Sequence, residues 1–128
     1  MLAPNQDLDS ATWWAALREH RVEVQSCRAC AHRWVPPTPA CPYCGAAEAA
    51  AVVVVGSGTV YSYVIVNRAL SDNMAGQAPY TVAAVDLDGG GRLFARIEGD
   101  EIAIYDRLSP RFVDHDTWTE LRFTKASS

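Results

Sequence analysis

Apolar and polar positions alternate with a period of two along the second half of the chain, which predicts β-strands. In residues 60–66, valine or serine at every second position shares one face, while two tyrosines and an isoleucine share the other. Similar runs occupy residues 52–55, 80–87, 92–97, 102–105, 111–113 and 118–123. About five strands joined by hairpins within roughly 75 residues predict a small closed barrel of the OB type. An SH3-like barrel fits the pattern nearly as well.

Glycines and polar residues mark the turns between these strands. Asp88 and the three glycines that follow it join residues 80–87 to residues 92–97 as a hairpin. Residues 67–77 are polar and predict a loop, and residues 56–58 (GSG) predict a turn. Because neither glycine cluster leads from a strand into a helix, neither is expected to bind phosphate.

A short helix is predicted over residues 11–21. Trp13, Trp14 and Leu17 recur at three- and four-residue spacing and form one apolar stripe along it. Two interpretations of this stripe stay open. It packs on the body of the protein itself, or it is an interface for a partner subunit, because buried tryptophan is a preferred anchor of protein interfaces.

Four cysteines lie in the pattern C-x2-C, ten residues, C-x2-C. Cys27 and Cys30 form the first pair, and Cys41 and Cys44 form the second. Each pair presents two sulfurs from a tight turn, and two such turns facing each other build the tetrahedral four-sulfur site that zinc prefers. The sequence therefore predicts a zinc ribbon with Zn²⁺ as its cofactor.

Other roles for the cysteines are weaker. Two disulfides need an oxidising compartment, which nothing in the sequence indicates, and a redox C-x-x-C usually stands alone at the start of a helix. Iron in the same site stays open, because four-sulfur sites accept either metal. Since four protein ligands leave no position for water or substrate, the predicted metal is structural. Arg28, His32 and Arg33 lie nearby and are expected to offset the charge of the thiolates.

The strand predicted over residues 92–97 separates two sets of side chains. Its apolar set is expected to face the core: Leu93, Ala95 and Ile97. The opposite surface carries Arg92, Phe94 and Arg96, which makes these residues candidates for contacts with coenzyme A or another phosphate-bearing ligand. The alternative is a solvated face on which arginine pairs with Asp86.

Charge and hydropathy limit the classes of binding partner and the cellular location that are expected for this chain. Eleven basic and fifteen acidic residues give a formal net charge of −4, and a zinc ion held by four thiolates makes it more negative. Nucleic-acid binding depends on cationic side chains that displace counterions, so nucleic acid is not an expected partner. No apolar run is long enough to span a bilayer and no secretory signal opens the chain, so a cytoplasmic location without a membrane partner is expected.

The order of helix, four-cysteine ribbon and glycine-punctuated barrel resembles a known family from Trp13 to about Phe123. The segments that carry the resemblance are WWAALRE (13–19), CRAC (27–30), PP (36–37), CPYCG (41–45), GSGTVYSY (56–63), PY (79–80) and RLFAR (92–96). The family comprises zinc-ribbon and OB-fold proteins associated with acyl-CoA enzymes, known as domain of unknown function thirty-five. Its late barrel strand usually contains an isoleucine-glycine pair where this chain has Ile104 and Tyr105, so an altered bend is expected there.

We therefore predict a mainly β protein in three parts. An N-terminal helix and lead-in strand occupy residues 1–25, a rubredoxin-like zinc ribbon occupies residues 26–50, and a five-stranded OB-fold barrel occupies residues 51–128. The resemblance implies an accessory subunit, or a domain of a longer protein, without catalytic residues of its own.

The partner implied by the resemblance is a thiolase-like acyl-CoA aldolase, with an enoyl-CoA hydratase as a second partner and acyl-CoA as ligand. Residues 112–116 (FVDHD), together with Trp118 and residues 122–123 (RF), are similar to the version found at the end of a steroid hydratase subunit. That version also associates with a retro-aldolase, which implies a role in the degradation of steroid side chains.

Two functions of other classes remain as alternatives. Zinc ribbons and OB barrels often bind single-stranded nucleic acid, which predicts an affinity that falls steeply with salt. A free-standing enzyme that uses Asp114, His115 or Asp116 predicts turnover without any partner.

Overall fold

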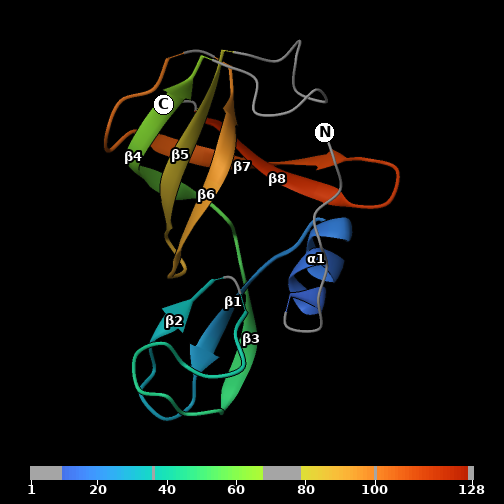
Figure 1. Ribbon diagram of the computed structural model, residues 1–128, viewed down its shortest axis with the longest axis vertical. Coiled ribbons are helices and arrows are strands. Elements are labelled where there is room, and N and C mark those ends of the chain that lie inside the picture. The colour runs from blue at the N-terminus through green and yellow to red at the C-terminus, as the bar shows by residue number, and fades with distance from the viewer. Residues whose placement is uncertain (1–9, 36, 68–78, 100, 127–128) are drawn as a thin grey trace.

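A computed structural model describes residues 10–35, 37–67, 79–99 and 101–126. These residues form one helix, a three-stranded sheet and a five-stranded barrel (Figure 1). The helix and the sheet comprise α1 (Ala11–Arg18), β1 (Val22–Cys27), β2 (Arg33–Trp34) and β3 (Ala49–Val54). The barrel comprises β4 (Gly58–Val66), β5 (Tyr80–Leu87), β6 (Arg92–Glu98), β7 (Arg107–Asp114) and β8 (Thr119–Lys125).

The helix α1 ends at Arg18, three residues before its predicted end. His20 adopts a φ of 61°, in the left-handed region. The His20 N–H donates to the Leu17 carbonyl at 2.8 Å, and the Arg21 N–H donates to the Ala16 carbonyl at 2.8 Å. This pair of bonds is the Schellman motif, which closes a helix and turns the chain away, here with histidine in the position that glycine usually takes.

The ribbon sheet has the order β2-β1-β3, with antiparallel neighbours. The strand expected over residues 52–55 is β3, and it pairs with β1 along its whole length, from Val22 opposite Val54 to Cys27 opposite Ala49. It is therefore a strand of the ribbon sheet, and the barrel begins with β4 at Gly58, the last residue of the segment predicted as a turn.

The barrel closes in the order β4-β5-β6-β8-β7. Neighbouring strands are antiparallel except β6 and β8, which run parallel through Ile97 opposite Phe123. Closure between β4 and β7 is short and involves Gly58 and Thr59. This order, in which the first barrel strand pairs with the fourth and the third runs parallel to the fifth, confirms the OB-type prediction over the SH3-like alternative.

The prediction of a strand over residues 102–105 is wrong. The segment forms a turn in which the Ala103 N–H donates to the Asp106 carboxylate at 2.8 Å, while the Asp106 N–H donates to the Ala103 carbonyl at 3.1 Å. Tyr105 has a φ of 72°, which a strand does not allow. Its N–H donates to the Val60 carbonyl at 2.8 Å and fixes the turn on β4. The family glycine expected at this point is thus replaced by a tyrosine in the conformation that glycine favours.

Replacing Tyr105 by glycine is expected to stabilise the protein by up to about 1 kcal/mol, because an L side chain in the left-handed region costs about that much. Little packing is lost, since the Tyr105 side chain is exposed. Urea unfolding of Tyr105→Gly measures the gain. Ile104→Gly is the matched control: Ile104 is also exposed but has no positive φ, so glycine there is expected to destabilise. Equal losses in both variants would contradict the argument.

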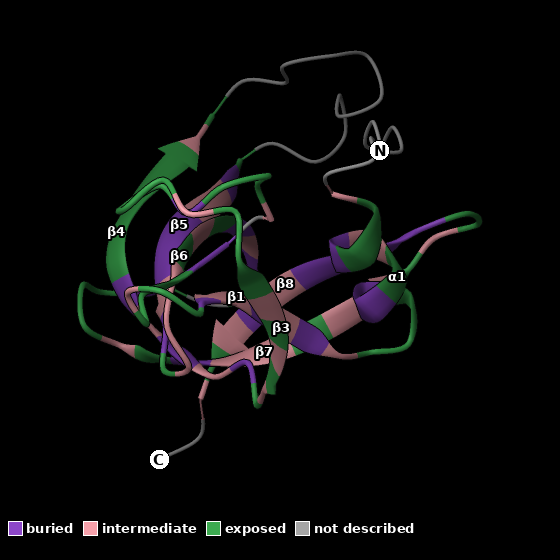
Figure 2. Cartoon of the chain, turned by 90° about the horizontal axis from the view of Figure 1, so that it is seen from below, coloured by how far each residue is buried: buried purple, intermediate pink, exposed green. Residues whose placement is uncertain are grey.

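One apolar core joins the N-terminal elements to the barrel. Trp13 and Leu17 of α1 and Val22 and Val24 of β1 lie in the same buried cluster as barrel residues such as Phe123. Figure 2 shows these buried segments of α1 and β8 lying near one another. In the part of the chain that the structure describes, no helix is both long enough and apolar enough to cross a membrane.

The turn between β5 and β6 lies directly on the ribbon sheet, and its glycines allow this approach. A Cβ on Gly89 would collide with Val54, and one on Gly90 would lie 2.8 Å from the Arg33 side chain. Gly90 and Gly91 also have φ values of 108° and 90°. The Arg33 guanidinium donates to the Gly89 carbonyl at 2.9 Å. The glycine run therefore makes a turn and also sets the barrel against the ribbon.

Candidate metal centre and surfaces

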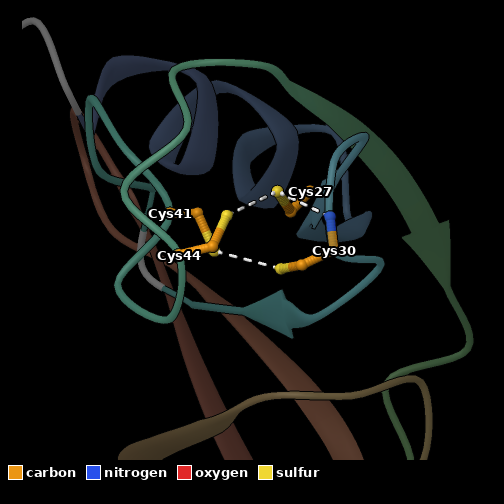
Figure 3. A group of neighbouring side chains, drawn as sticks. All are labelled: Cys27, Cys30, Cys41 and Cys44. Atoms are coloured by element: carbon orange, nitrogen blue, oxygen red, sulfur yellow. Dashed lines mark hydrogen bonds between the residues drawn. The ribbon is translucent and has the colours of Figure 1, made fainter.

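The four cysteines of the ribbon converge on one point (Figure 3). Their sulfur atoms all lie within 4.8 Å of one another. The Cys27 and Cys44 sulfurs are 3.6 Å apart, and so are those of Cys30 and Cys41. Each cysteine of one turn thus faces a cysteine of the other turn.

Two similar turns position these sulfurs. The Ala31 N–H donates to the Cys27 carbonyl at 2.9 Å, and the Gly45 N–H donates to the Cys41 carbonyl at 2.9 Å. Ala31 and Gly45 both adopt left-handed backbone, with φ values of 67° and 80°. Backbone N–H groups at Cys30 and Tyr43 point to the sulfurs of Cys27 and Cys41, at 3.4 Å in each case. Such N–H groups stabilise thiolates and prepare the site for a cation.

The donor set fits zinc. A tetrahedral ion with zinc–sulfur bonds of about 2.3 Å separates its sulfurs by about 3.8 Å, close to the two distances of 3.6 Å. All four cysteines are free of disulfides. A zinc held by four protein sulfurs has no open position, so the site is suited to a structural ion, as predicted.

The thiols of Cys27 and Cys30 have pKa values shifted in opposite directions. The backbone N–H of Cys30 lowers the pKa of Cys27 to about 7. The backbone N–H of His32 also lowers the pKa of Cys30, but burial and the neighbouring sulfurs outweigh it and raise this pKa to about 12. A dication that accepts all four thiolates removes the repulsion between them.

Of the basic residues expected beside the metal, His32 is the one that the structure places against a sulfur. Its Nδ1 lies 3.3 Å from the Cys30 sulfur. The imidazole stacks on the Tyr43 ring, with centroids 4.3 Å apart. This stack joins the two cysteine turns, and no motif in the sequence predicts it. Arg33 instead points to the turn at Gly89.

The tryptophan stripe of α1 is used mainly within the chain. Trp13 and Leu17 belong to the buried core. Trp14 is half-buried and meets Trp118 edge-on, with ring centroids 5.9 Å apart. These positions agree with packing on the protein's own body, the first of the two interpretations. Trp13, Trp14 and Leu17 also line one wall of an apolar groove of about 660 Å³, whose other walls come from β5, β6 and β8.

The alternation predicted in β6 is present. Ala95 and Ile97 are buried in the core, and Leu93 packs against it from a half-buried position. On the outer surface, Arg92 donates to the Asp86 carboxylate at 2.5 and 3.2 Å, as in the solvated-face alternative. Its guanidinium also lies 3.5 Å from the centre of the Tyr61 ring.

The other two residues of this outer set differ from each other. Arg96 lies over the Tyr80 ring at 4.8 Å, whereas Phe94 is 78% exposed. Binding of coenzyme A by Arg92, Phe94 and Arg96 stays a prediction, and it must compete with the Asp86 carboxylate for Arg92.

Asp114 and His115 form hydrogen bonds that hold the β7–β8 hairpin. Asp114 accepts hydrogen bonds from the Thr119 hydroxyl at 2.6 Å and from His20 at 2.9 Å, and these two bonds lower its pKa. His115 stacks on Trp118 and lies 3.0 Å from the Glu120 carboxylate. Asp116 contributes its backbone carbonyl to the Arg18 guanidinium at 3.1 Å.

Family models match both halves of the chain. The ChsH2 rubredoxin-like zinc ribbon domain matches residues 14–48, and the ChsH2 C-terminal OB-fold domain matches residues 51–113. The first contains all four cysteines, and the second covers most of the barrel.

Two curated relatives are hydratase subunits. The "probable enoyl-CoA hydratase alpha subunit" of Thermomonospora curvata is 36% identical over 96 residues, which cover 75% of this chain and 30% of the relative. The "3-oxo-4,17-pregnadiene-20-carboxyl-CoA hydratase alpha subunit" of Mycobacterium tuberculosis is 26% identical over 123 residues, which cover 93% of this chain and 38% of the relative. The chain thus spans about a third of the length of the curated relatives it matches.

Two solved structures share the fold. A DUF35 protein of unknown function from Sulfolobus solfataricus has a TM-score of 0.67 at 18% identity, covering 91% of this chain and 84% of that chain. The structure described as "Ltp2-ChsH2(DUF35) aldolase" has a TM-score of 0.85 at 31% identity, covering 98% of this chain and 100% of that chain. The resemblance found in the sequence is confirmed: this chain belongs to the DUF35 family, with the ChsH2 type of zinc ribbon and OB-fold domain.

Proposed function

We propose that this chain is an accessory subunit, or the equivalent domain of a longer protein, of a thiolase-like acyl-CoA aldolase. The observation that carries the proposal is the likeness to the Ltp2-ChsH2(DUF35) aldolase, whose matched chain is covered completely at 31% identity. In that structure's description a DUF35 chain accompanies a second component, Ltp2.

The reaction class follows from the same description. An acyl-CoA aldolase working in the cleavage direction breaks the bond between the α and β carbons of a β-hydroxyacyl-CoA, which gives a carbonyl compound and a shorter acyl-CoA. The steroid acyl-CoA named for the Mycobacterium tuberculosis relative supports a steroid side chain as the substrate, at 26% identity. The names of the two hydratase alpha subunits support an enoyl-CoA hydratase as a second partner, since hydration of an enoyl-CoA forms the β-hydroxyacyl-CoA that an aldolase cleaves.

In this proposal the partner subunit supplies the catalytic residues. The zinc of this chain contributes structure, because its four sulfur ligands leave no position for substrate. Asp114 and His115, the residues considered for catalysis in the sequence, are occupied in holding α1 and the β7–β8 hairpin.

Co-expression with an Ltp2-type aldolase subunit tests this function. We expect the two chains to elute together with the mass of a hetero-oligomer, and we expect cleavage of a steroid β-hydroxyacyl-CoA to exceed that of the aldolase subunit alone. Each subunit assayed separately is the control. Failure to form a complex, or cleavage by this chain unaided, would overturn the proposal.

A further inference from the structure

The outer half of β4 exposes apolar side chains on both of its faces. Tyr63, Val64 and Ile65 are consecutive, so they point alternately to opposite sides of the strand, and all three are exposed. Figure 2 shows most of this strand as exposed. A strand in a barrel normally buries one face, so this segment projects beyond the part of the barrel that is filled by the core.

One edge of the same segment has no neighbouring strand among the described residues. Residues 62–66 of β4 pair with β5 on one side. On the other side β4 pairs with β7 only at Gly58 and Thr59. Natural proteins cover or charge such edges, because an exposed apolar edge promotes association. Residues 62–66 contain no charged side chain.

A further exposed apolar side chain, Phe94, lies on β6 and is separated from β4 by the buried Ala84. Ser62 lies opposite Ala84, and Ala84 lies opposite Phe94, so these three residues form one row across the sheet. Phe94 is 78% exposed at the end of this row, and Tyr61 is exposed beside it. We name as the β4 surface the five exposed residues Tyr61, Tyr63, Val64, Ile65 and Phe94.

The charges around the β4 surface favour a protein partner over a phosphate-bearing ligand. Arg92, the cation that touches Tyr61, is neutralised by two hydrogen bonds to Asp86. By contrast, the side of the barrel where β6 meets β8 carries ion pairs, including Arg122 with Glu98 and Glu120. An uncharged aromatic and aliphatic patch is typical of the centre of a protein interface.

We propose that the β4 surface is the docking site for the thiolase-like subunit, which would cover both faces and the open edge of residues 62–66. This inference rests on the proposed function. The occupant follows from the aldolase relative, in which a chain fully covered by this one accompanies a second component. The partner's complementary patch is uncharged and apolar, because the β4 surface offers it no unpaired charge.

A pair of valines gives a matched test. Val64 on β4 and Val53 on β3 are 61% and 60% exposed. Val53 lies on the edge strand of the ribbon sheet, and Val64 lies in the segment of β4 that does not pair with β7. We expect Val64→Lys to weaken the complex with the co-expressed aldolase subunit at least tenfold, because it places a charge in the interface. Val53→Lys is expected to change the dissociation constant by less than threefold. Isothermal titration of the zinc-loaded chain with the aldolase subunit measures both.

A second variant and two controls make the result decisive. Phe94→Ala is expected to weaken the complex about tenfold through lost apolar contact. Zinc content and the urea midpoint of each variant establish that it is folded before titration. If the unsubstituted chain does not bind the aldolase subunit, the proposed function fails. If it binds and Val64→Lys binds equally well, only the docking site is wrong. A homodimer of the chain alone that Val64→Lys dissociates would assign the surface to a second copy and overturn the proposal.

Discussion

Removal of zinc is expected to unfold residues 27–48 while the barrel remains folded. Among the residues that the structure describes, the cluster around the cysteines has three buried side chains, Cys27, Trp34 and Cys41, so it has too little apolar area to fold by itself. Zinc binding by four thiolates contributes about 10–16 kcal/mol in small zinc domains, and most of the local stability is therefore that of the metal site. The barrel strands share a separate buried cluster with α1 and β1, and this cluster includes none of the four cysteines.

Hydrogen exchange after chelation measures this effect residue by residue. The amides of Cys27 and Cys41, which donate to the carbonyls of His32 and Ala46 at 2.8 Å, are expected to lose protection. Those of β5 and β8 are expected to keep it. Adding zinc back provides the control, since it should restore the original pattern. Protected cysteine amides in the metal-free chain would contradict the prediction, and so would loss of the barrel together with the ribbon.

Truncating Phe123 to alanine is expected to lower the free energy of unfolding by about 3–5 kcal/mol. Phe123 is one of the largest fully buried side chains and has no exposed surface. It lies where β8 meets β6 in parallel pairing and β7 in antiparallel pairing, opposite Ile97 and Pro110. The cavity therefore opens at the junction of three strands, where the backbone cannot collapse to fill it. Urea unfolding of the zinc-loaded protein gives the value.

Phe94→Ala is the matched control for this substitution. It removes the same atoms from a ring that is 78% exposed, so unfolding is expected to change by less than about 0.5 kcal/mol. A similar loss in the two variants would show that exposure does not determine the cost. Because Phe94 belongs to the β4 surface, the same variant separates stability from partner binding.

Local patterns in the sequence predicted the features that depend on spacing. The cysteine pairs fix the metal site because a short turn already places two sulfurs together, and the period of two fixed which residues of β6 face the core. The pairing partner of a strand is not encoded locally in this way. The valines at residues 52–54 resemble a barrel strand, and only the ladder from Val22 to Cys27 assigns them to the ribbon.

The strand predicted over residues 102–105 and the predicted start of β7 were wrong for specific physical reasons. Tyr105 stands in a left-handed turn that its residue type does not indicate, so residues 102–105 resembled a strand. Pro110 made β7 look shorter than it is, yet it pairs opposite Phe123 inside a strand that runs from Arg107 to Asp114. The exposed apolar surface on β4 could not be foreseen either, because alternation predicts one buried face and β4 extends past the core that would bury it.

The tight fit of the 89–91 turn on the ribbon has a mechanical consequence. The side chains of Arg33 and Val54 pack directly against this turn. The helix α1 and the strand β1 also belong to the same buried core as the barrel. Among the described residues there is therefore no hinge between the zinc ribbon and the barrel. A subunit that binds β4 therefore also determines the position and orientation of the zinc site, because the ribbon and the barrel move as one rigid body.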